Sequence, residues 1–250
     1  MRPRLYCPMP LSEGAITELP AAVAHHAARV LRLREGDSVT LFNGDGGEFD
    51  ACLSRIEPKS VLAAVGGHHA VERESPLHVT LMQGLASAER MDWLIQKAVE
   101  LGVTAIAPVT MARSVTRLDA ARAAKRAEHW RSVIVASCEQ CGRNRLPLLH
   151  PLSDFAAVLA APDPADRAIV NGAALSLVLA PGEGLSLKKF DRPEGAIRVL
   201  IGPEGGLTPD ELSAAMRAGF RAAIFGPRVL RTETAGIAAL AAMNVLWGDG

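Results

Sequence analysis

The sequence predicts an α/β protein of two domains, with a small, mostly β domain over residues 1–73 and an α/β domain over residues 74–250. Short alternating segments separated by turn signals fill the first part, whereas strand-like and helix-like segments alternate after residue 76. Between them, Arg73-Glu74-Ser75-Pro76 has the composition of a linker. A chain of 250 residues is long enough for two modest domains.

In the first domain, residues 39–42 and 49–53 are expected to form a hairpin around the Asn-Gly turn at 43–47. A third strand is expected over 60–65, ended by a pair of glycines, and a helix over about 20–33. Three short strands and one helix in some 70 residues favour a compact barrel.

In the second domain, alternation predicts βα units, and therefore a mainly parallel sheet covered on both faces. The expected strands are 77–83, 104–109, 167–171, 197–201 and 222–225, and the expected helices are about 88–101, 119–138, 153–160, 208–218 and 233–247. Ligands of such sheets bind at the carboxyl ends of the strands, so the loops that follow the strands should carry the chemistry.

Charge and composition exclude several classes of protein. With 27 basic and 27 acidic residues, the chain is not a globally basic nucleic-acid binder, although residues 113–145 hold eight basic residues against three acidic ones. That excess fits either an RNA-binding patch or a solvated helix face. No apolar run approaches the roughly 20 residues of a membrane-spanning helix, and the first residues lack a signal-peptide core, so we expect a soluble, cytoplasmic protein.

The four cysteines are expected to be reduced thiols. Cys138 and Cys141 have the spacing of half a zinc site or of a redox pair. A zinc site needs a second pair of ligands, which neither Cys7 nor Cys52 supplies at ligand spacing, and the pair ends a helix instead of opening one. We therefore expect no metal.

Two loops carry the strongest functional signals. The first, after the strand 197–201, reads Gly202-Pro203-Glu204-Gly205-Gly206-Leu207, and its glycines let the backbone approach a ligand closely. Thr208 then starts a helix as its N-cap in a capping box. An ordinary glycine-rich turn would explain the same residues.

The second loop follows the next strand and reads Phe225-Gly226-Pro227-Arg228-Val229-Leu230-Arg231. Thr232 is expected to cap the last helix, and Glu233 lies in its first turn. The helix dipole alone would favour a carboxylate there. Because the Walker and dinucleotide-binding signatures are missing, the loops suit a ligand read by main-chain groups, such as an adenosine without a polyphosphate.

The strings LIGPEGGLTPDE at 200–211 and FGPRVLRTETA at 225–235 resemble the RsmE family, and weaker matches extend over nearly the whole chain. One departure is Ala112, where relatives often carry Glu. RsmE proteins are 16S ribosomal RNA methyltransferases of the SPOUT class that use S-adenosylmethionine to methylate N3 of a uridine. The resemblance implies a PUA-like barrel, an α/β domain with a C-terminal trefoil knot, and a homodimer with its sites at the interface.

The resemblance also implies the site. The residues expected at the cofactor are Asn171, Gly172, Ile201, Gly202, Glu204, Gly205, Phe225, Gly226, Val229, Leu230 and Arg231. Since the uracil N3 proton must leave, Arg231 is a candidate to stabilise negative charge on the base, and Glu233 or Glu204 to accept the proton. No metal is required.

Contacts to 16S rRNA are expected from arginines, because a uridine held in rRNA must be extruded to reach the cofactor. The candidates are Arg4, Arg29, Arg32, Arg113 and Arg143, although Arg32 could instead be packed under the barrel. Two rival classes remain at this point. One is an RNA-binding protein without activity, which the retained loops disfavour, and the other is an NAD-linked enzyme, which the missing dinucleotide fingerprint disfavours.

Overall fold

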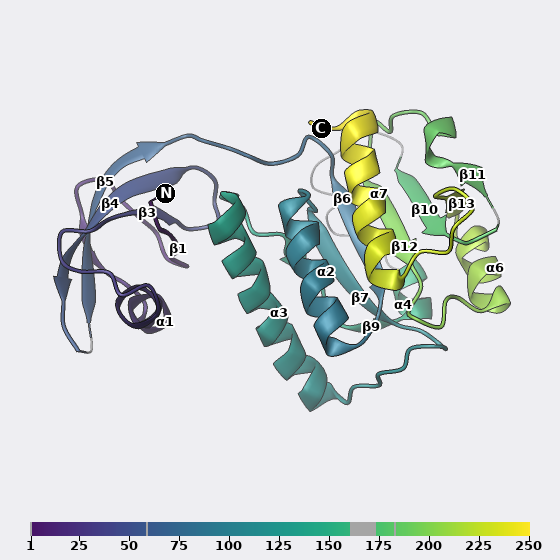
Figure 1. Cartoon of the computed structure of the whole chain (residues 1–250), viewed down its shortest axis with the longest axis horizontal. Coiled ribbons are helices and arrows are strands. Elements are labelled where there is room, and N and C mark those ends of the chain that lie inside the picture. The colour runs from purple at the N-terminus through teal and green to yellow at the C-terminus, as the bar shows by residue number, and fades with distance from the viewer. Residues whose placement is uncertain (1, 59, 161–173, 183) are drawn as a thin grey trace. The chain divides into compact units, whose positions relative to one another are not determined.

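The computed structural model describes residues 2–58, 60–160, 174–182 and 184–250 (Figure 1). Two compact units emerge. The first unit contains Met1–Glu74 and Val135–Leu146, and the second contains Ser75–Ile134 and Pro147–Gly250. The expected boundary between residues 73 and 74 did not anticipate that 135–146, far along the chain, would pack with the first unit.

The first unit is built on a five-stranded sheet in the order β1-β3-β4-β5-β2. Its strands are β1 (Arg4–Tyr6), β2 (Ile16–Glu18), β3 (Ser38–Phe42), β4 (Glu48–Ile56) and β5 (Val61–His69). The expected hairpin is confirmed by the antiparallel pairing of β3 with β4. However, β5 continues to His69, through the glycines that were expected to end it.

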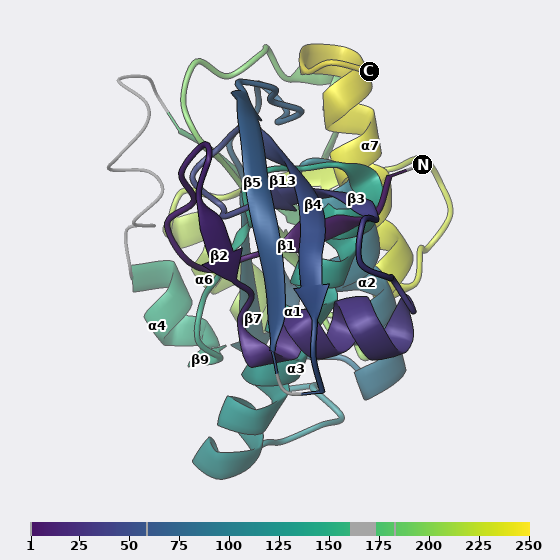
Figure 2. The same cartoon turned by 90° about the vertical axis from the view of Figure 1, so that its left-hand side faces the viewer.

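One helix packs on this sheet and changes its geometry midway. Helix α1 (Ala21–His25) is continued by a π-helical turn, His26–Val30, and its Ala24 and Ala27 join the strand side chains in the core. Figure 2 shows α1 crossing one end of the paired strands β4 and β5. The segment ends at Arg32, whose φ of 56° lies in the left-handed region that non-glycine residues avoid.

A partly buried polar network joins residues 135–146 to the rest of the first unit. Arg4 donates to Glu48 at 2.6 Å and to the Asn144 Oδ1 at 2.6 Å, and the Asn144 amide donates to the Val71 carbonyl at 2.6 Å. Burial alone would raise the pKa of Glu48, but hydrogen bonds from Arg73, Arg4 and Asn144 lower it to about 2. The segment is therefore held by specific polar contacts, which pattern analysis does not detect.

In the described part of the second unit, eight parallel strands form a sheet in the order β11-β13-β10-β12-β6-β7-β8, with β9 also on β7. The strands are β6 (Val79–Gly84), β7 (Ala105–Thr110), β8 (Leu148–Leu149), β9 (Ser153–Asp154), β10 (Leu175–Leu179), β11 (Leu185–Ser186), β12 (Ile197–Ile201) and β13 (Arg221–Ile224). The prediction of a parallel sheet is thus confirmed. The strand expected at 167–171 lies outside the described residues.

Helices cover both faces of this sheet (Figure 1). They are α2 (Ala88–Glu100), α3 (Ala120–Cys141, shared between the two units), α4 (Phe155–Ala160), α6 (Pro209–Arg217) and α7 (Thr232–Trp247), with a short 3-10 turn at Leu187–Lys189. Along β6, Leu81 faces α2 and α7, where it packs near Gly236, whereas Met82 faces the cluster of α4 and α6. Alternating strand side chains thus explain the two apolar layers.

Candidate functional site

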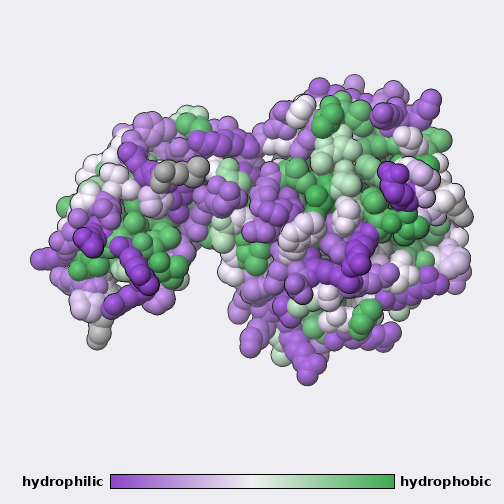
Figure 3. Space-filling model, viewed as in Figure 1, coloured by the Kyte–Doolittle hydropathy of each residue, from purple (hydrophilic) through white to green (hydrophobic). Residues whose placement is uncertain are grey.

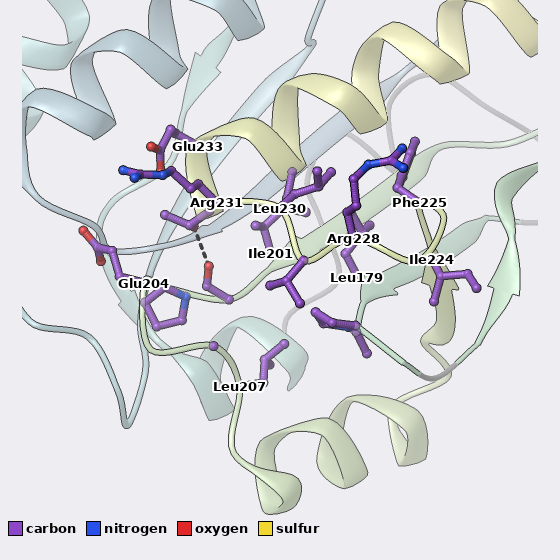
Figure 4. Close-up of a pocket in the computed structure, with 18 of the residues that line it drawn as sticks. Leu179, Ile201, Glu204, Leu207, Ile224, Phe225, Arg228, Leu230, Arg231 and Glu233 are labelled. Atoms are coloured by element: carbon purple, nitrogen blue, oxygen red, sulfur yellow. Dashed lines mark hydrogen bonds between the residues drawn. The ribbon is translucent and has the colours of Figure 1, made fainter.

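A cavity of about 500 Å³ opens at the carboxyl ends of β10, β12 and β13. The loop after β12 and the loop between β13 and α7 form most of its wall (Figure 4). Nine residues expected at the cofactor line it: Ile201, Gly202, Glu204, Gly205, Phe225, Gly226, Val229, Leu230 and Arg231. Asn171 and Gly172 lie outside the described residues.

Sequence reasoning missed part of this wall. Leu179, Ala180 and Pro181, at the end of β10, also line the cavity, whereas the strand end expected at 170–172 lies outside the described residues. Arg90 of α2 also lines it, although it lies more than a hundred residues before the two loops. The sequence carried a signal for the first group, since 175–179 is a short apolar run before a proline, but none for Arg90.

The cavity has an apolar side and a charged end. Leu179, Leu207, Ile224 and Phe225 surround the apolar side, whereas Figure 4 shows Glu204, Arg231 and Glu233 gathered at the other end. Such a combination of apolar surface with a few convergent polar groups is typical of small-molecule sites.

At the charged end, one arginine joins two carboxylates. The Arg90 Nη1 donates to Glu204 Oε1 at 3.0 Å, and its Nε lies 3.7 Å from Glu233 Oε1. Glu204 Oε1 also accepts the Ser87 N–H, at the start of α2, at 2.9 Å. Burial alone would raise the pKa of Glu204, but the Ser87 and Glu204 N–H groups and Arg90 hold it below its usual value.

Glu204 and Glu233 each have one carboxylate oxygen that accepts no hydrogen bond from the residues described. The Oε2 atoms of Glu204 and Glu233 are buried and have no hydrogen-bond partner within the described structure. Buried oxygens of this kind are costly to leave without a donor, so the charged end has acceptor capacity to spare.

A second contact chain connects three segments around the cavity. The buried Gln83 side chain, on β6, donates to Thr232 Oγ1 at 2.7 Å, and that hydroxyl donates to the Gly202 carbonyl at 2.6 Å. Thr232 was expected to be an N-cap, but the structure corrects this: Arg231 occupies the N-cap position and Thr232 begins the helix. Its hydroxyl is used to join α7 to the loop after β12.

The first glycine-rich loop packs against protein on its outer side. Arg113 Nη1 donates to the carbonyls of Gly205 at 3.1 Å and Leu207 at 3.3 Å. A Cβ added to Gly205 would lie 2.8 Å from the Arg113 Cβ, so the absent side chain makes room for Arg113. The predicted capping box of Thr208 and Glu211 is confirmed at the end of the loop.

The arginines expected to contact RNA differ sharply in exposure. Arg29 and Arg32 are exposed on the first unit, and Arg113 is exposed beside the cavity. By contrast, Arg4 keeps only 9% of its side chain exposed and pairs with Glu48. Arg143, 4% exposed, donates from Nε to Glu74 Oε2 at 3.0 Å, so these two act within the first unit.

The cysteines form no disulfide, and all four lie in the described part of the chain. Burial raises the pKa of Cys7 to about 11 and that of Cys138 to about 12. Among the described residues, no three His, Cys, Asp or Glu side chains gather into a metal-binding group. No helix described here is long and apolar enough to cross a bilayer.

Comparisons with known proteins match both parts of the chain. Residues 73–244 match the family described as an RNA methyltransferase domain, and residues 19–65 match an RNA methyltransferase PUA domain. The ribosomal RNA small subunit methyltransferase E of Bacillus subtilis is 31% identical over 237 residues, 94% of this chain and 91% of the relative. The protein of that name from Mycobacterium bovis is 34% identical over 236 residues, 93% of this chain and 87% of the relative.

The chain belongs to the ribosomal RNA small subunit methyltransferase E family. Solved structures agree along the full length. A methyltransferase E from Neisseria gonorrhoeae, bound to S-adenosylmethionine, has a TM-score of 0.90 and 39% identity, covering 100% of this chain and 99% of its own. A putative methyltransferase from Legionella pneumophila, also in complex with S-adenosylmethionine, has a TM-score of 0.93 and 34% identity, with full coverage of both chains.

Membership of the methyltransferase E family confirms the resemblance found in the sequence. It also confirms the coarse fold, a PUA-like domain together with an α/β methyltransferase domain.

Proposed function

We propose that this chain is a cytoplasmic enzyme that transfers the methyl group of S-adenosylmethionine to N3 of a uridine in the 16S rRNA of the small ribosomal subunit. The observation that carries the proposal is the cavity between the two loops, in a chain whose relatives are named ribosomal RNA small subunit methyltransferase E. Two solved relatives that match over the full length hold the same cofactor.

The residues present fit this cofactor. About 500 Å³ is within the usual range for a ligand of nucleoside size, and apolar side chains line one side of the space. The cofactor would be held by the nine lining residues predicted for it, together with Leu179 at the end of β10. When bound, S-adenosylmethionine supplies a methyl group that its sulfonium has already activated. We also propose Asn171 and Gly172 as part of this pocket.

The protein must then position the uracil and remove its N3 proton. In our proposal, Arg231 stabilises negative charge that develops on the base, and Glu233 accepts the proton. Glu204 is less suited to that role, because its Oε1 already accepts two hydrogen bonds and its pKa is lowered. Glu233 contacts Arg90 at a longer distance of 3.7 Å.

Arg29, Arg32 and Arg113 are the proposed rRNA contacts, since they are exposed. The left-handed backbone of Arg32 supports this choice, because such strain, of order 1–3 kcal/mol, tends to persist where a side chain has a function. Arg4 and Arg143 are left out of the proposed contact surface, because burial and ion pairs engage their guanidinium groups.

We propose that the C-terminal part forms the trefoil knot of the SPOUT class. β13 pairs on the outer side of β10, and the chain then returns so that α7 packs against β12, β6 and α2. The Thr232–Gly202 bond joins the returning segment to the loop after β12. These contacts support the proposed knot.

A homodimer is proposed from the exposed face of α7. Val245 is 71% exposed and Leu246 40%, and they border an apolar hollow with Ala238, Ala241 and Ala242. Figure 3 shows apolar side chains over α7 and beside it. A contiguous apolar surface of this kind is typical of an interface. Light scattering at micromolar concentration should therefore give twice the mass of 26.4 kDa.

The activity is tested with small subunits from a strain that lacks the endogenous enzyme. The purified protein and labelled S-adenosylmethionine should produce 3-methyluridine, detected by mass spectrometry of digested 16S rRNA. Naked 16S rRNA and assembled subunits are compared in parallel. Cofactor binding without transfer to either substrate, or label on another atom or RNA, would contradict the proposal.

A further inference from the structure

Arg90 makes a contact pattern that no other described residue around the cavity makes. Its guanidinium reaches Glu204, in the loop after β12, and Glu233, in the first turn of α7. It lies on α2, one turn after the Ser87 N–H that also binds Glu204. One side chain from a rigid helix therefore contacts a carboxylate on each side of the charged end.

The contacts of Arg90 matter because the two carboxylates are largely buried. The side chains of Glu204 and Glu233 are 18% and 13% exposed, and that of Arg90 is 37% exposed. Without Arg90, two carboxylates would lie together in a partly buried site and would lack the cation that pairs with both of them. Like charges at short range repel. Each would rotate towards solvent, away from the position from which it can act on a ligand.

We propose that Arg90 is a positioning residue: its guanidinium bridges Glu204 and Glu233 and thereby orients Glu233 towards the reacting base. This inference rests on the proposed function, in which Glu233 accepts the N3 proton. Arg90 itself transfers no proton and forms no bond to the substrate, because a guanidinium stays protonated throughout the working range of pH.

The cofactor cradle has its own supports, so its integrity does not depend on Arg90. The Gln83–Thr232–Gly202 contacts join α7 to the first loop, and Arg113 holds the same loop through two carbonyls. Loss of Arg90 should therefore affect the rate of transfer more than the affinity for the cofactor.

The test is a double-mutant cycle between Arg90→Gln and Glu233→Gln on the full-length protein. Arg90→Gln should lower kcat by about 10–100-fold, because a misplaced general base loses part of a contribution of about 10²–10⁴. Its Kd for S-adenosylmethionine, from calorimetry, should change by less than about fivefold. In the Glu233→Gln background, Arg90→Gln should have almost no further effect on kcat, because the residue acts through Glu233.

Two further variants separate positioning from a general structural role. Arg90→Lys, which keeps the charge but cannot fork between two carboxylates, should recover part of kcat. Arg217→Gln is the matched control, because Arg217 is an exposed arginine at the end of α6 that does not line the cavity, and this variant should keep the wild-type kcat and Kd.

The outcomes are distinguishable. Additive effects in the cycle, or an Arg90→Gln protein that loses cofactor binding in proportion to kcat, would overturn the role given to Arg90. Full kcat in Glu233→Gln would overturn the assignment of the proton acceptor, and with it this proposal. A wild-type protein that methylates no small-subunit rRNA would overturn the proposed function before any variant is made.

Discussion

Replacing Thr232 by Val tests the contact chain that joins α7 to the loop after β12. Valine has nearly the same shape as threonine, so the change removes the hydroxyl and little else. The hydroxyl accepts from Gln83 at 2.7 Å and donates to the Gly202 carbonyl at 2.6 Å, and Thr232 is only 7% exposed. Gln83 keeps a second acceptor in Gly84, but the Gly202 carbonyl loses the Thr232 hydroxyl.

The expected cost follows from these contacts. A buried polar group left without its partner costs about 1–3 kcal/mol, and the lost Gln83 bond adds about 0.5–1.5 kcal/mol, so about 1.5–4.5 kcal/mol is expected in all. For a domain of this size, about 2–4 °C in Tm corresponds to each kcal/mol, so Tm should fall by about 3–18 °C. Affinity for S-adenosylmethionine should fall as well, because the loop is no longer tied to α7.

The assay is thermal unfolding by calorimetry, with cofactor titration as a second measurement. Thr234→Val is the matched control, because Thr234 is exposed two residues later on the same helix and should change stability by less than about 0.5 kcal/mol. Thr232→Ser, which keeps the hydroxyl, should lie close to the wild type. A fall in Tm below 2 °C, or one equal to that of Thr234→Val, would refute the reasoning.

Three further predictions concern stability and reactivity. Glu48→Gln should lower the free energy of unfolding by up to about 3 kcal/mol at pH 7, since the pKa of Glu48 is lowered to about 2. This stabilisation is present above about pH 4.5 and is lost as the pH falls towards 2. The unfolding free energies of the two proteins, measured by denaturation at several pH values, should therefore converge in acid. Gly84→Ala should destabilise more than Gly206→Ala, because its Cβ would lie 2.8 Å from the Gly202 carbonyl carbon, whereas Gly206 has open space and only an unfavourable φ of 69°; equal urea midpoints would contradict this. Cys138, whose pKa is about 12, should resist alkylation at pH 8 far longer than the less buried Cys141, as peptide mass spectrometry can follow.

Elements with strong local signals were predicted well. The strand 197–201 was predicted at its observed bounds, because an apolar run ends there at a glycine. The capping box at Thr208 was also predicted, since all of its partners lie within four residues. The three-residue strands β1 and β2 were missed, because they are too short to show a period and are defined by pairing with β3 and β5.

The candidate site also has a part that local sequence patterns predict and a part that they do not. Its glycine-rich loops are local patterns, and the residues predicted from them line the cavity wherever the structure describes them. Arg90 could not be found in this way, because its meaning depends on two carboxylates, in segments more than 110 residues away, that the fold brings to one helix. The loops that line the cavity can thus be predicted from the sequence, whereas Arg90, which we propose orients the proton acceptor, cannot.

The candidate RNA-binding arginines also show that the sequence does not reveal ion-pair partners that lie far along the chain. Arg4 and Arg32 were chosen alike, as cations of the first domain, yet Arg4 is held by Glu48 and Asn144 while Arg32 is exposed on a strained backbone. The partners of Arg4 lie 44 and 140 residues away, and no local sequence pattern indicates them.

A cation whose charge is already neutralised adds little to phosphate binding. Removing Arg32 should therefore lower the salt dependence of rRNA binding by about one ion, whereas removing Arg4 should act through stability. Filter binding at several salt concentrations, with Arg34→Ala as an exposed control, would separate the two effects. Equal salt slopes for Arg32→Ala and Arg34→Ala would remove Arg32 from the contact surface.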